Sequence, residues 1–275
     1  MPRATVPIRR RHRPGSATPW CDVGVDGLQV TGDAHDGIIR EVSFGLHHNG
    51  REVPGVLWRP ETDSVAPVVL LGHGGSGHKR SERNVRLATW FARAGIASLS
   101  IDGPFHGDRA VGGDGPLDYQ DRIVQVGARI IHDRMRQDWL GALDAAEQSG
   151  WIDGRGVAFL GMSMGARYGL PVCAALGPRL RCAVIGKFGL TQTDLLPQGL
   201  TVSDLIIEAA AAIRAPVLQH IQWHDELFPR DGQRKLFDVI QSPGKLLRGR
   251  PGRHALTRPD DEFAWREHVA THLAP

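Results

Sequence analysis

Ser163 is the residue whose surroundings point most directly to chemistry. It lies at the centre of Gly161–Gly165, a Gly-x-Ser-x-Gly sequence that follows an apolar run and precedes a helix-compatible segment. This order is typical of a nucleophile elbow, a sharp strand-to-helix turn that exposes one serine hydroxyl. The alternative is a glycine-rich turn that happens to contain a serine, but the flanking strand and helix patterns favour a nucleophile.

A serine hydroxyl is a weak nucleophile at neutral pH, so it needs a base, and the base needs an orienting acid. In chains with this elbow, the acid and then the histidine follow the serine. Asp225 comes directly after the strand-like segment 216–223 and is the first candidate for the acid. Glu226 is the neighbouring alternative, whereas Asp231 is placed to cap the next helix.

His254 is the candidate base. The chain has thirteen histidines, but His254 alone combines the required order with a loop position after the predicted last strand, 245–247. His220 falls inside a predicted strand, and His224 is adjacent to Asp225. The sequence therefore predicts a Ser163–His254–Asp225 triad.

Acyl transfer also needs backbone N–H groups for the oxyanion. Met164 follows the nucleophile and is expected to supply one donor. The other donor is expected from Gly75 or Gly74, in the glycine-rich loop after segment 68–71. Such a loop before a helix also suits phosphate. The loop lacks the Gly-Lys-Ser/Thr ending of a nucleotide P-loop, and no nucleotide cofactor is expected.

The loop 102–109 follows another predicted strand, at the sheet edge where open α/β sheets place ligands. His106 in this loop either lines the site or fixes the loop through Asp102 or Asp108. Five side chains are expected to line a substrate pocket: His106, Phe105, Met162, Phe188 and Trp223. The apolar ones among them would suit the hydrophobic core equally well.

Strand-like and helix-like segments alternate along the chain, which favours βαβ units and a mostly parallel sheet. Asn49-Gly50 is a strong hairpin signal and predicts two antiparallel opening strands. We therefore expect an α/β fold with about eight strands, helices on both faces and a minimal lid. The predicted strands are 38–47, 52–58, 68–71, 96–101, 157–162, 182–188, 216–223 and 245–247. The predicted helices are 81–94, 117–149 with a break, 166–176, 202–213, 232–240 and 261–273.

Charge separates the chain into two parts. Residues 1–35 are expected to be a flexible extension, because they carry five arginines within the first 20 positions and no acid there. In residues 21–275 the remaining 28 Lys and Arg face 30 Asp and Glu, although the whole chain has a net charge of +3. Residues 36–275, predicted as a single α/β domain, therefore give no electrostatic case for nucleic-acid binding.

Several further features bear on location and metals. No 18-residue apolar run predicts a membrane span. No apolar stretch follows Arg9–Arg11, so a cytoplasmic protein is expected. The three cysteines show no disulfide or zinc spacing. His268 and His272 lie four apart, a spacing that can bind metal, but without a carboxylate cluster they are expected at the surface. No metal is therefore expected.

Together these motifs resemble the α/β-hydrolase superfamily, within it the dienelactone-hydrolase-like and small-esterase branch. The resemblance covers about residue 38 to the C-terminus. It rests on five segments in order, His73–Gly77, Asp102–Gly107, Gly161–Gly165, Asp225–Pro229 and Pro251–His254. The chain carries Ser163 where dienelactone hydrolases have cysteine and where epoxide hydrolases and dehalogenases have aspartate. Dienelactone is therefore not implied as the substrate.

The resulting hypothesis is a cofactor-independent serine hydrolase that cleaves small carboxylic esters through an acyl-enzyme, as a monomer or homodimer. The same triad also permits thioesterase, lactonase or peptidase activity. Two hypotheses from other classes remain: a non-catalytic binding or scaffold member of the fold, and an enzyme that acts through a histidine-bound metal.

Overall fold

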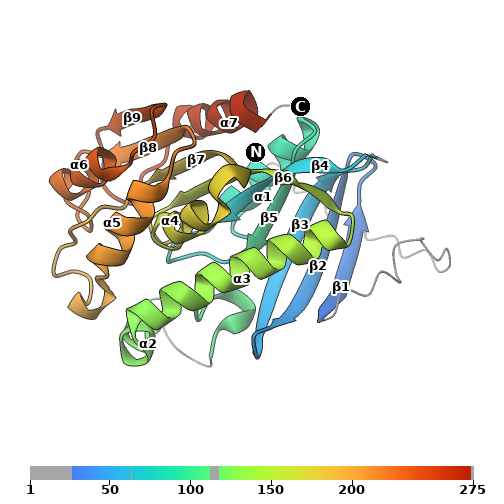
Figure 1. The fold of residues 1–275 in the computed structure, drawn as a ribbon, viewed down its shortest axis with the longest axis horizontal. Coiled ribbons are helices and arrows are strands. Elements are labelled where there is room, and N and C mark those ends of the chain that lie inside the picture. Colours follow the sequence, from blue (N-terminus) through green and yellow to red (C-terminus); the bar gives the residue numbers. More distant parts are fainter. Residues whose placement is uncertain (1–26, 63, 112–117, 274–275) are drawn as a thin grey trace, which may run out of the picture.

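The computed structural model describes residues 27–62, 64–111 and 118–273. In this part of the chain nine strands form one sheet, in the order β1-β2-β3-β5-β4-β6-β7-β8-β9. β1, β2 and β3 are antiparallel to their neighbours, and all strands from β5 to β9 in this order run parallel. The expectation of a mostly parallel sheet with an antiparallel start is confirmed, with nine strands instead of about eight (Figure 1). The strands are β1 Leu28–His35, β2 Ile39–His48, β3 Arg51–Pro60, β4 Ala66–Gly72, β5 Ala97–Ile101, β6 Ile152–Met162, β7 Leu180–Gly186, β8 Val217–Gln222 and β9 Lys245–Arg250.

The N-terminal boundary differs from the expectation. Leu28–His35 was expected within a flexible extension, but it forms β1, which pairs with β2 along its length. Most of its side chains are exposed. An edge strand of this kind is held by backbone hydrogen bonds and leaves no strong apolar pattern in the sequence. The arginines of the expected extension and Cys21 lie in residues 1–26, outside the described residues.

The predicted hairpin between β2 and β3 is present. Asn49 and Gly50, at its tip, have positive φ angles of 50° and 72°. Two central residues with positive φ are the requirement of a type I′ turn, whose twist matches the flanking strands. The turn therefore fixes the register in which His48 pairs with Arg51.

Helices cover both faces of the sheet (Figure 1). α1 and α7 pack on one face through Leu87, Phe91 and Trp265. α3, α4, α5 and α6 contribute to the apolar cluster on the other face. The helix expected at 117–149 is broken at Gly127. The helices are α1 Glu82–Arg93, α2 Asp118–Val126, α3 Ala128–Gln148, α4 Met164–Leu176, α5 Ser203–Ala212, α6 Arg230–Val239 and α7 Pro259–Leu273, with short 3₁₀ turns at Gly107–Arg109, Gly177–Arg179 and Gln198–Leu200.

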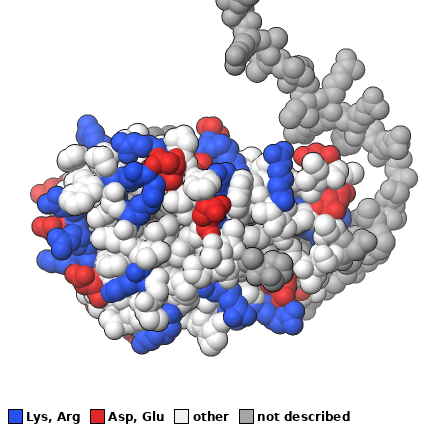
Figure 2. Space-filling view, turned by 90° about the horizontal axis from the view of Figure 1, so that it is seen from above, with Lys and Arg blue, Asp and Glu red and all other residues white. Residues whose placement is uncertain are grey.

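The surface of the described residues is of mixed charge. On the face shown in Figure 2, acidic side chains lie among the basic ones rather than in a separate area. None of the helices in the described part of the chain has the length and apolar character needed to cross a bilayer.

The centre of the sheet is packed tightly where α4 begins. A Cβ atom on Gly165 would lie 2.6 Å from the backbone oxygen of Gly72 in β4. A Cβ on Gly161 would lie 2.7 Å from the carbonyl carbon of Gly165. Real side chains do not tolerate such distances, so both glycines are required for the first turn of α4 to rest on β4 and β6. This close packing aims the start of α4 at the carboxyl edge of the parallel strands.

Candidate active site

Three residues from three separate loops form one hydrogen-bonded chain at the carboxyl edge of the sheet. His254 Nε2 lies 2.8 Å from Ser163 Oγ. His254 Nδ1 lies 3.0 and 2.9 Å from the two carboxylate oxygens of Asp225. The carboxylate accepts from Nδ1–H, so Nε2 keeps its lone pair toward the serine hydroxyl. The structure thus brings together the three residues that the sequence proposed as a triad.

Ser163 lies on a strained turn between β6 and α4. Its φ and ψ angles are 58° and −119°, a backbone conformation that costs energy for any residue with a Cβ atom. Its N–H donates to the Gly186 carbonyl at the end of β7, at 2.8 Å. Met164 is the first residue of α4, where helix N–H groups have no acceptor within the helix. The turn therefore holds the hydroxyl outward beside free backbone donors.

Asp225 follows β8, where the sequence placed it, and its carboxylate is fully buried. Asp225 Oδ1 accepts hydrogen bonds from the N–H groups of Leu227 and Phe228, both at 2.9 Å. These bonds fix the direction of the carboxylate toward His254. The alternative acid, Glu226, instead accepts from the backbone N–H of His254 at 2.9 Å. Asp231 lies in the first turn of α6.

The loop that carries His254 is anchored by Lys187, the residue that directly follows β7. The Lys187 ammonium donates to the Leu256 carbonyl at 2.6 Å and to the Thr257 hydroxyl at 2.7 Å. Burial lowers the pKa of Lys187 to about 8. Its partners lie about 70 positions further along the chain, so only the folded structure shows this anchoring function.

The glycine-rich loop after β4 is fixed through two histidines. His73 Nε2 accepts from the Gly103 N–H at 2.8 Å, while Nδ1 donates to the Gly74 carbonyl at 2.8 Å. Burial lowers the pKa of His73 to about 3, so its ring stays neutral and can accept that bond. His106 Nε2 donates to the Gly75 carbonyl at 2.8 Å. His106 was expected to line the site or to fix the loop 102–109 through Asp102 or Asp108; its ring instead contacts the carbonyls of Pro104, at 2.7 Å, and of Gly75.

The aspartates of the neighbouring loop bind a lysine instead. Asp102 is fully buried and contacts the Lys79 ammonium at 2.6 Å and the Lys79 N–H at 2.8 Å. Asp108 pairs with the same ammonium at 2.6 Å. This cluster joins the loop after β4 to the loop after β5. Sequence reasoning missed Lys79, because nothing in its local pattern marks a buried lysine.

A cavity of about 370 Å³ opens beside Ser163 and His254. Met162 lines it, as expected, and so do Gly74, Gly75 and Met164, the residues proposed as oxyanion donors. α2 and the segment before α5 cover it with Tyr119, Gln120, Ile123, Leu196 and Leu200.

Four of the side chains expected to line this cavity do not. Trp223 is 44% exposed and lies under the Arg230 guanidinium. Phe105 packs against the core. His106 is hydrogen-bonded to the Gly75 carbonyl. Phe188 lines a smaller neighbouring cavity. The sequence placed all four near the correct edge of the sheet, but it contained no information on where their side chains point.

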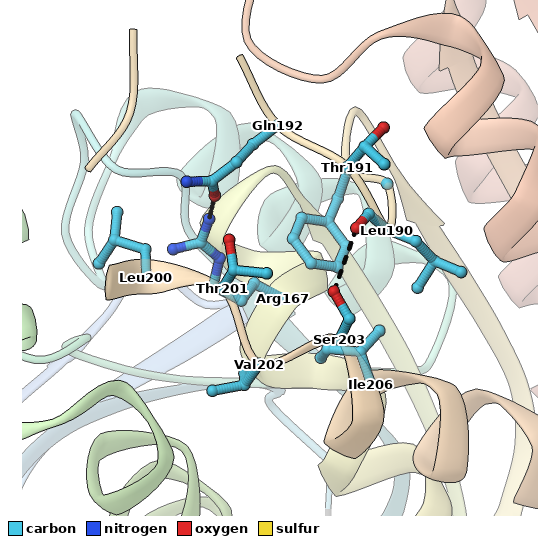
Figure 3. A pocket seen from close by; sticks show the side chains of 11 residues that line it. Arg167, Leu190, Thr191, Gln192, Leu200, Thr201, Val202, Ser203 and Ile206 are labelled. Carbon is cyan, nitrogen blue, oxygen red and sulfur yellow. Dashed lines mark hydrogen bonds between the residues drawn. The ribbon is translucent and has the colours of Figure 1, made fainter. Parts of the chain in front are cut away.

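Arg167, one turn into α4, lies between the two cavities and lines both. It is 7% exposed, its guanidinium lies 5.6 Å from the centre of the Phe188 ring, and it donates to Gln192 at 3.3 Å. Figure 3 shows the hydrogen bond between Arg167 and Gln192 at the smaller cavity, whose volume is about 20 Å³. Burial lowers the pKa of Arg167. Among the described residues no carboxylate pairs with it, so a buried cation faces the cavity without a counter-ion.

Tyr168 is a second polar group at the same place. Tyr168 lines the larger cavity, and its buried hydroxyl has no hydrogen-bond partner among the described residues. Burial raises the pKa of Tyr168, so the hydroxyl keeps its proton and can donate. A second guanidinium, that of Arg83, also lines the cavity.

Solved structures similar to this chain include esterases and dienelactone hydrolases. A novel cold-adapted esterase from an Arctic intertidal metagenomic library is 31% identical, with a TM-score of 0.76 over 89% of this chain and 99% of that protein. The acetyl xylan esterase from Paenibacillus sp. R4 is 18% identical, with a TM-score of 0.72 over 92% of this chain and 91% of the other. Dienelactone hydrolase from Anabaena variabilis is 19% identical, with a TM-score of 0.61 over 85% of this chain and 96% of the other. No protein-family model and no curated protein matches the sequence.

The first of these relatives is similar in sequence as well as in structure, and the others share the fold. The chain therefore belongs to the α/β-hydrolase superfamily, in its dienelactone-hydrolase-like esterase branch.

Proposed function

We propose that this protein is a serine carboxylesterase whose triad is Ser163, His254 and Asp225. The observation that carries the proposal is the hydrogen-bonded chain from Ser163 Oγ through His254 to the buried Asp225 carboxylate, at distances of 2.8 and 2.9 Å. A base within hydrogen-bond reach of the nucleophile, itself oriented by an acid, is the arrangement that activates a serine. The esterase relatives support the ester as the bond that is cleaved.

In this mechanism His254 Nε2 takes the proton of Ser163 as its oxygen attacks the ester carbonyl. The Met164 N–H and an N–H from Gly75 or Gly74 stabilise the oxyanion. The protonated His254 then gives its proton to the departing alcohol, and an acyl-serine remains. A water molecule, deprotonated by His254, attacks the acyl carbon and releases the acid, and Ser163 recovers its proton. Asp225 holds the ring in the required tautomer and stabilises its charged form.

Covalent labelling tests this function directly. The purified protein is expected to hydrolyse p-nitrophenyl butyrate and to lose that activity after treatment with a fluorophosphonate. Peptide mass spectrometry is expected to find the adduct on Ser163. A chelator is expected to leave the rate unchanged, since no step needs a metal. A folded protein that neither turns over the ester nor takes the label would instead favour the non-catalytic member of the fold.

The charges in the cavity favour one group of esters. A buried guanidinium without a counter-ion is costly, and an anionic ligand that pairs with it removes part of that cost. Arg167 and the unpartnered Tyr168 hydroxyl together offer a cation and a hydrogen-bond donor, which suit a carboxylate. We therefore propose that the preferred substrate is an ester that carries a second, anionic group.

The charge preference is tested with a matched pair of substrates, mono-p-nitrophenyl glutarate and its methyl ester, which differ in one negative charge. The wild type is expected to prefer the anionic ester in kcat/KM. Arg167→Met is expected to reduce the anionic-to-neutral ratio of kcat/KM about 10- to 100-fold, the range that follows from a charge-assisted hydrogen bond. Arg134→Met, at an exposed position on α3, is the control and should keep the ratio.

A second pair of esters locates the charge. A butyrate ester of 4-hydroxybenzoate, compared with phenyl butyrate, carries the carboxylate on the alcohol side. If Arg167→Met changes neither ratio, the proposed anionic substrate is wrong while the esterase activity stands.

A further inference from the structure

A cluster of a thiol and two imidazoles lies away from the candidate triad. Cys182 is on β7, and His268 and His272 are on α7, which packs against that strand. One potential ligand atom from each residue lies within 4.8 Å of the others. His268 was expected at the surface, but it is only 8% exposed, because α7 turns it toward the sheet. Sequence spacing alone could not reveal this group, since 86 positions separate Cys182 from His268.

The histidines are in a state suited to ligation. His272 Nδ1 donates to the His268 carbonyl at 2.8 Å, which leaves Nε2 with the lone pair. His268 Nε2 is buried without a hydrogen-bond partner among the described residues. Ligating histidines usually donate their other nitrogen to a carbonyl, as His272 does, which fixes the tautomer and the direction of the ring.

Cys182 and His268 are both buried, and Cys182 Sγ lies 3.9 Å from the His268 carbonyl oxygen. When a divalent cation binds, a metal–sulfur bond replaces the S–H bond and one proton passes to solvent. The site without metal thus keeps an orphaned buried nitrogen, which a metal would satisfy.

We propose that Cys182, His268 and His272 bind a zinc ion that fastens α7 to the sheet. One thiolate and two imidazoles are ligands that zinc accepts, and a water molecule would complete a tetrahedral set. Zinc–nitrogen and zinc–sulfur bonds of about 2.0–2.3 Å place tetrahedral ligands about 3.3–3.6 Å apart, so the ligands must approach by about 1 Å. His272 is half-buried in the last turn of α7 and has the freedom to make that movement.

The position implies a structural role. Cys182 lies near the amino-terminal end of β7, whereas the Gly186 carbonyl that receives the Ser163 N–H lies at the other end of that strand. Trp265, Val269 and Leu273 of α7 pack into the same apolar cluster as Cys182. A bound ion would therefore join the closing helix to the core. It would not enter the ester cleavage proposed above, and this inference does not depend on that function.

Metal titration of the full-length, chelator-treated protein tests the site. Zn²⁺ is expected to bind with one-to-one stoichiometry by calorimetry, to release one proton, and to raise the Tm. Co²⁺ is expected to give the near-ultraviolet charge-transfer band of a thiolate ligand. Cys182→Ser is expected to lose that band, and His272→Ala to lower the Zn²⁺ affinity more than about 100-fold, beyond the usual loss for a supporting residue.

Control variants make the outcome decisive. His47→Ala, at an exposed position on β2, should keep the full affinity. His272→Gln is a conservative second variant, and circular dichroism checks that each variant is folded. If Zn²⁺ does not saturate the wild type, or if folded His272→Ala and Cys182→Ser bind as tightly as the wild type, the proposed site is wrong.

Discussion

Ser163→Ala is expected to lower kcat for p-nitrophenyl butyrate by about 10⁴- to 10⁶-fold, with little change in stability. The alanine removes the oxygen that would form the acyl-enzyme, while Gly161 and Gly165 keep the backbone of the turn. Residual hydrolysis would come from the oxyanion donors and from substrate binding. Steady-state rates and the burst of p-nitrophenol measure this effect, since a burst requires the acyl-serine.

The matched control is Ser203→Ala. Ser203 begins α5 and donates to the Leu190 carbonyl at 3.2 Å beside the smaller cavity (Figure 3). Ser203 lies near the site but does not contact His254. The kcat of Ser203→Ala is therefore expected to stay within a few-fold of the wild-type value. If Ser163→Ala keeps most of the wild-type rate, the serine mechanism is refuted.

Asp225→Asn is expected to lower kcat about 10⁴-fold. Asparagine can still accept the N–H groups of Leu227 and Phe228 through its carbonyl oxygen, so the loop should keep its shape. Its amide group would then face His254 Nδ1 as a donor. The ring would have to carry its proton on Nε2, where it blocks proton transfer from Ser163.

Two neighbouring acids serve as comparisons for this substitution. Glu226→Gln removes a charge beside the His254 backbone, but it leaves the ring hydrogen bond intact, so its loss should be far smaller. Asp231→Asn changes an exposed residue of α6 and should leave kcat close to the wild type. A loss in Glu226→Gln as large as in Asp225→Asn would show that the acid had been assigned to the wrong residue.

The candidate site was predictable from the sequence where local pattern carries chemistry. The Gly161–Gly165 elbow, the glycine loop at Gly74 and Gly75, and the order of Asp225 and His254 are all local signals. Each belongs to a loop that follows a parallel strand, and the carboxyl ends of parallel strands meet at one edge of a sheet. The fold class followed for the same reason, because alternating strands and helices leave few topologies open.

Other contacts depended on long-range packing. Lys187 reaches the loop of His254, Lys79 joins two loops through Asp102, and α7 brings His268 against Cys182. Their partners lie tens of residues away, and no local pattern encodes such a distance. The same limit explains why several side chains were wrongly expected to line the pocket. Trp223 is adjacent to the correct loop, but its side chain turns to solvent under Arg230.

The sequence by itself determined the class of fold, the nucleophile candidate and the order of its partners, because these depend on residue type and spacing along the chain. The tertiary structure decided which side chains share a cavity. It also placed Arg167 and Tyr168 at the wall of the cavity, where neither the guanidinium has a carboxylate partner nor the hydroxyl a hydrogen-bond partner among the described residues. In the tertiary structure the sheet begins at Leu28. Those features follow from the directions of side chains and from edge pairing, which are fixed only when distant segments pack together.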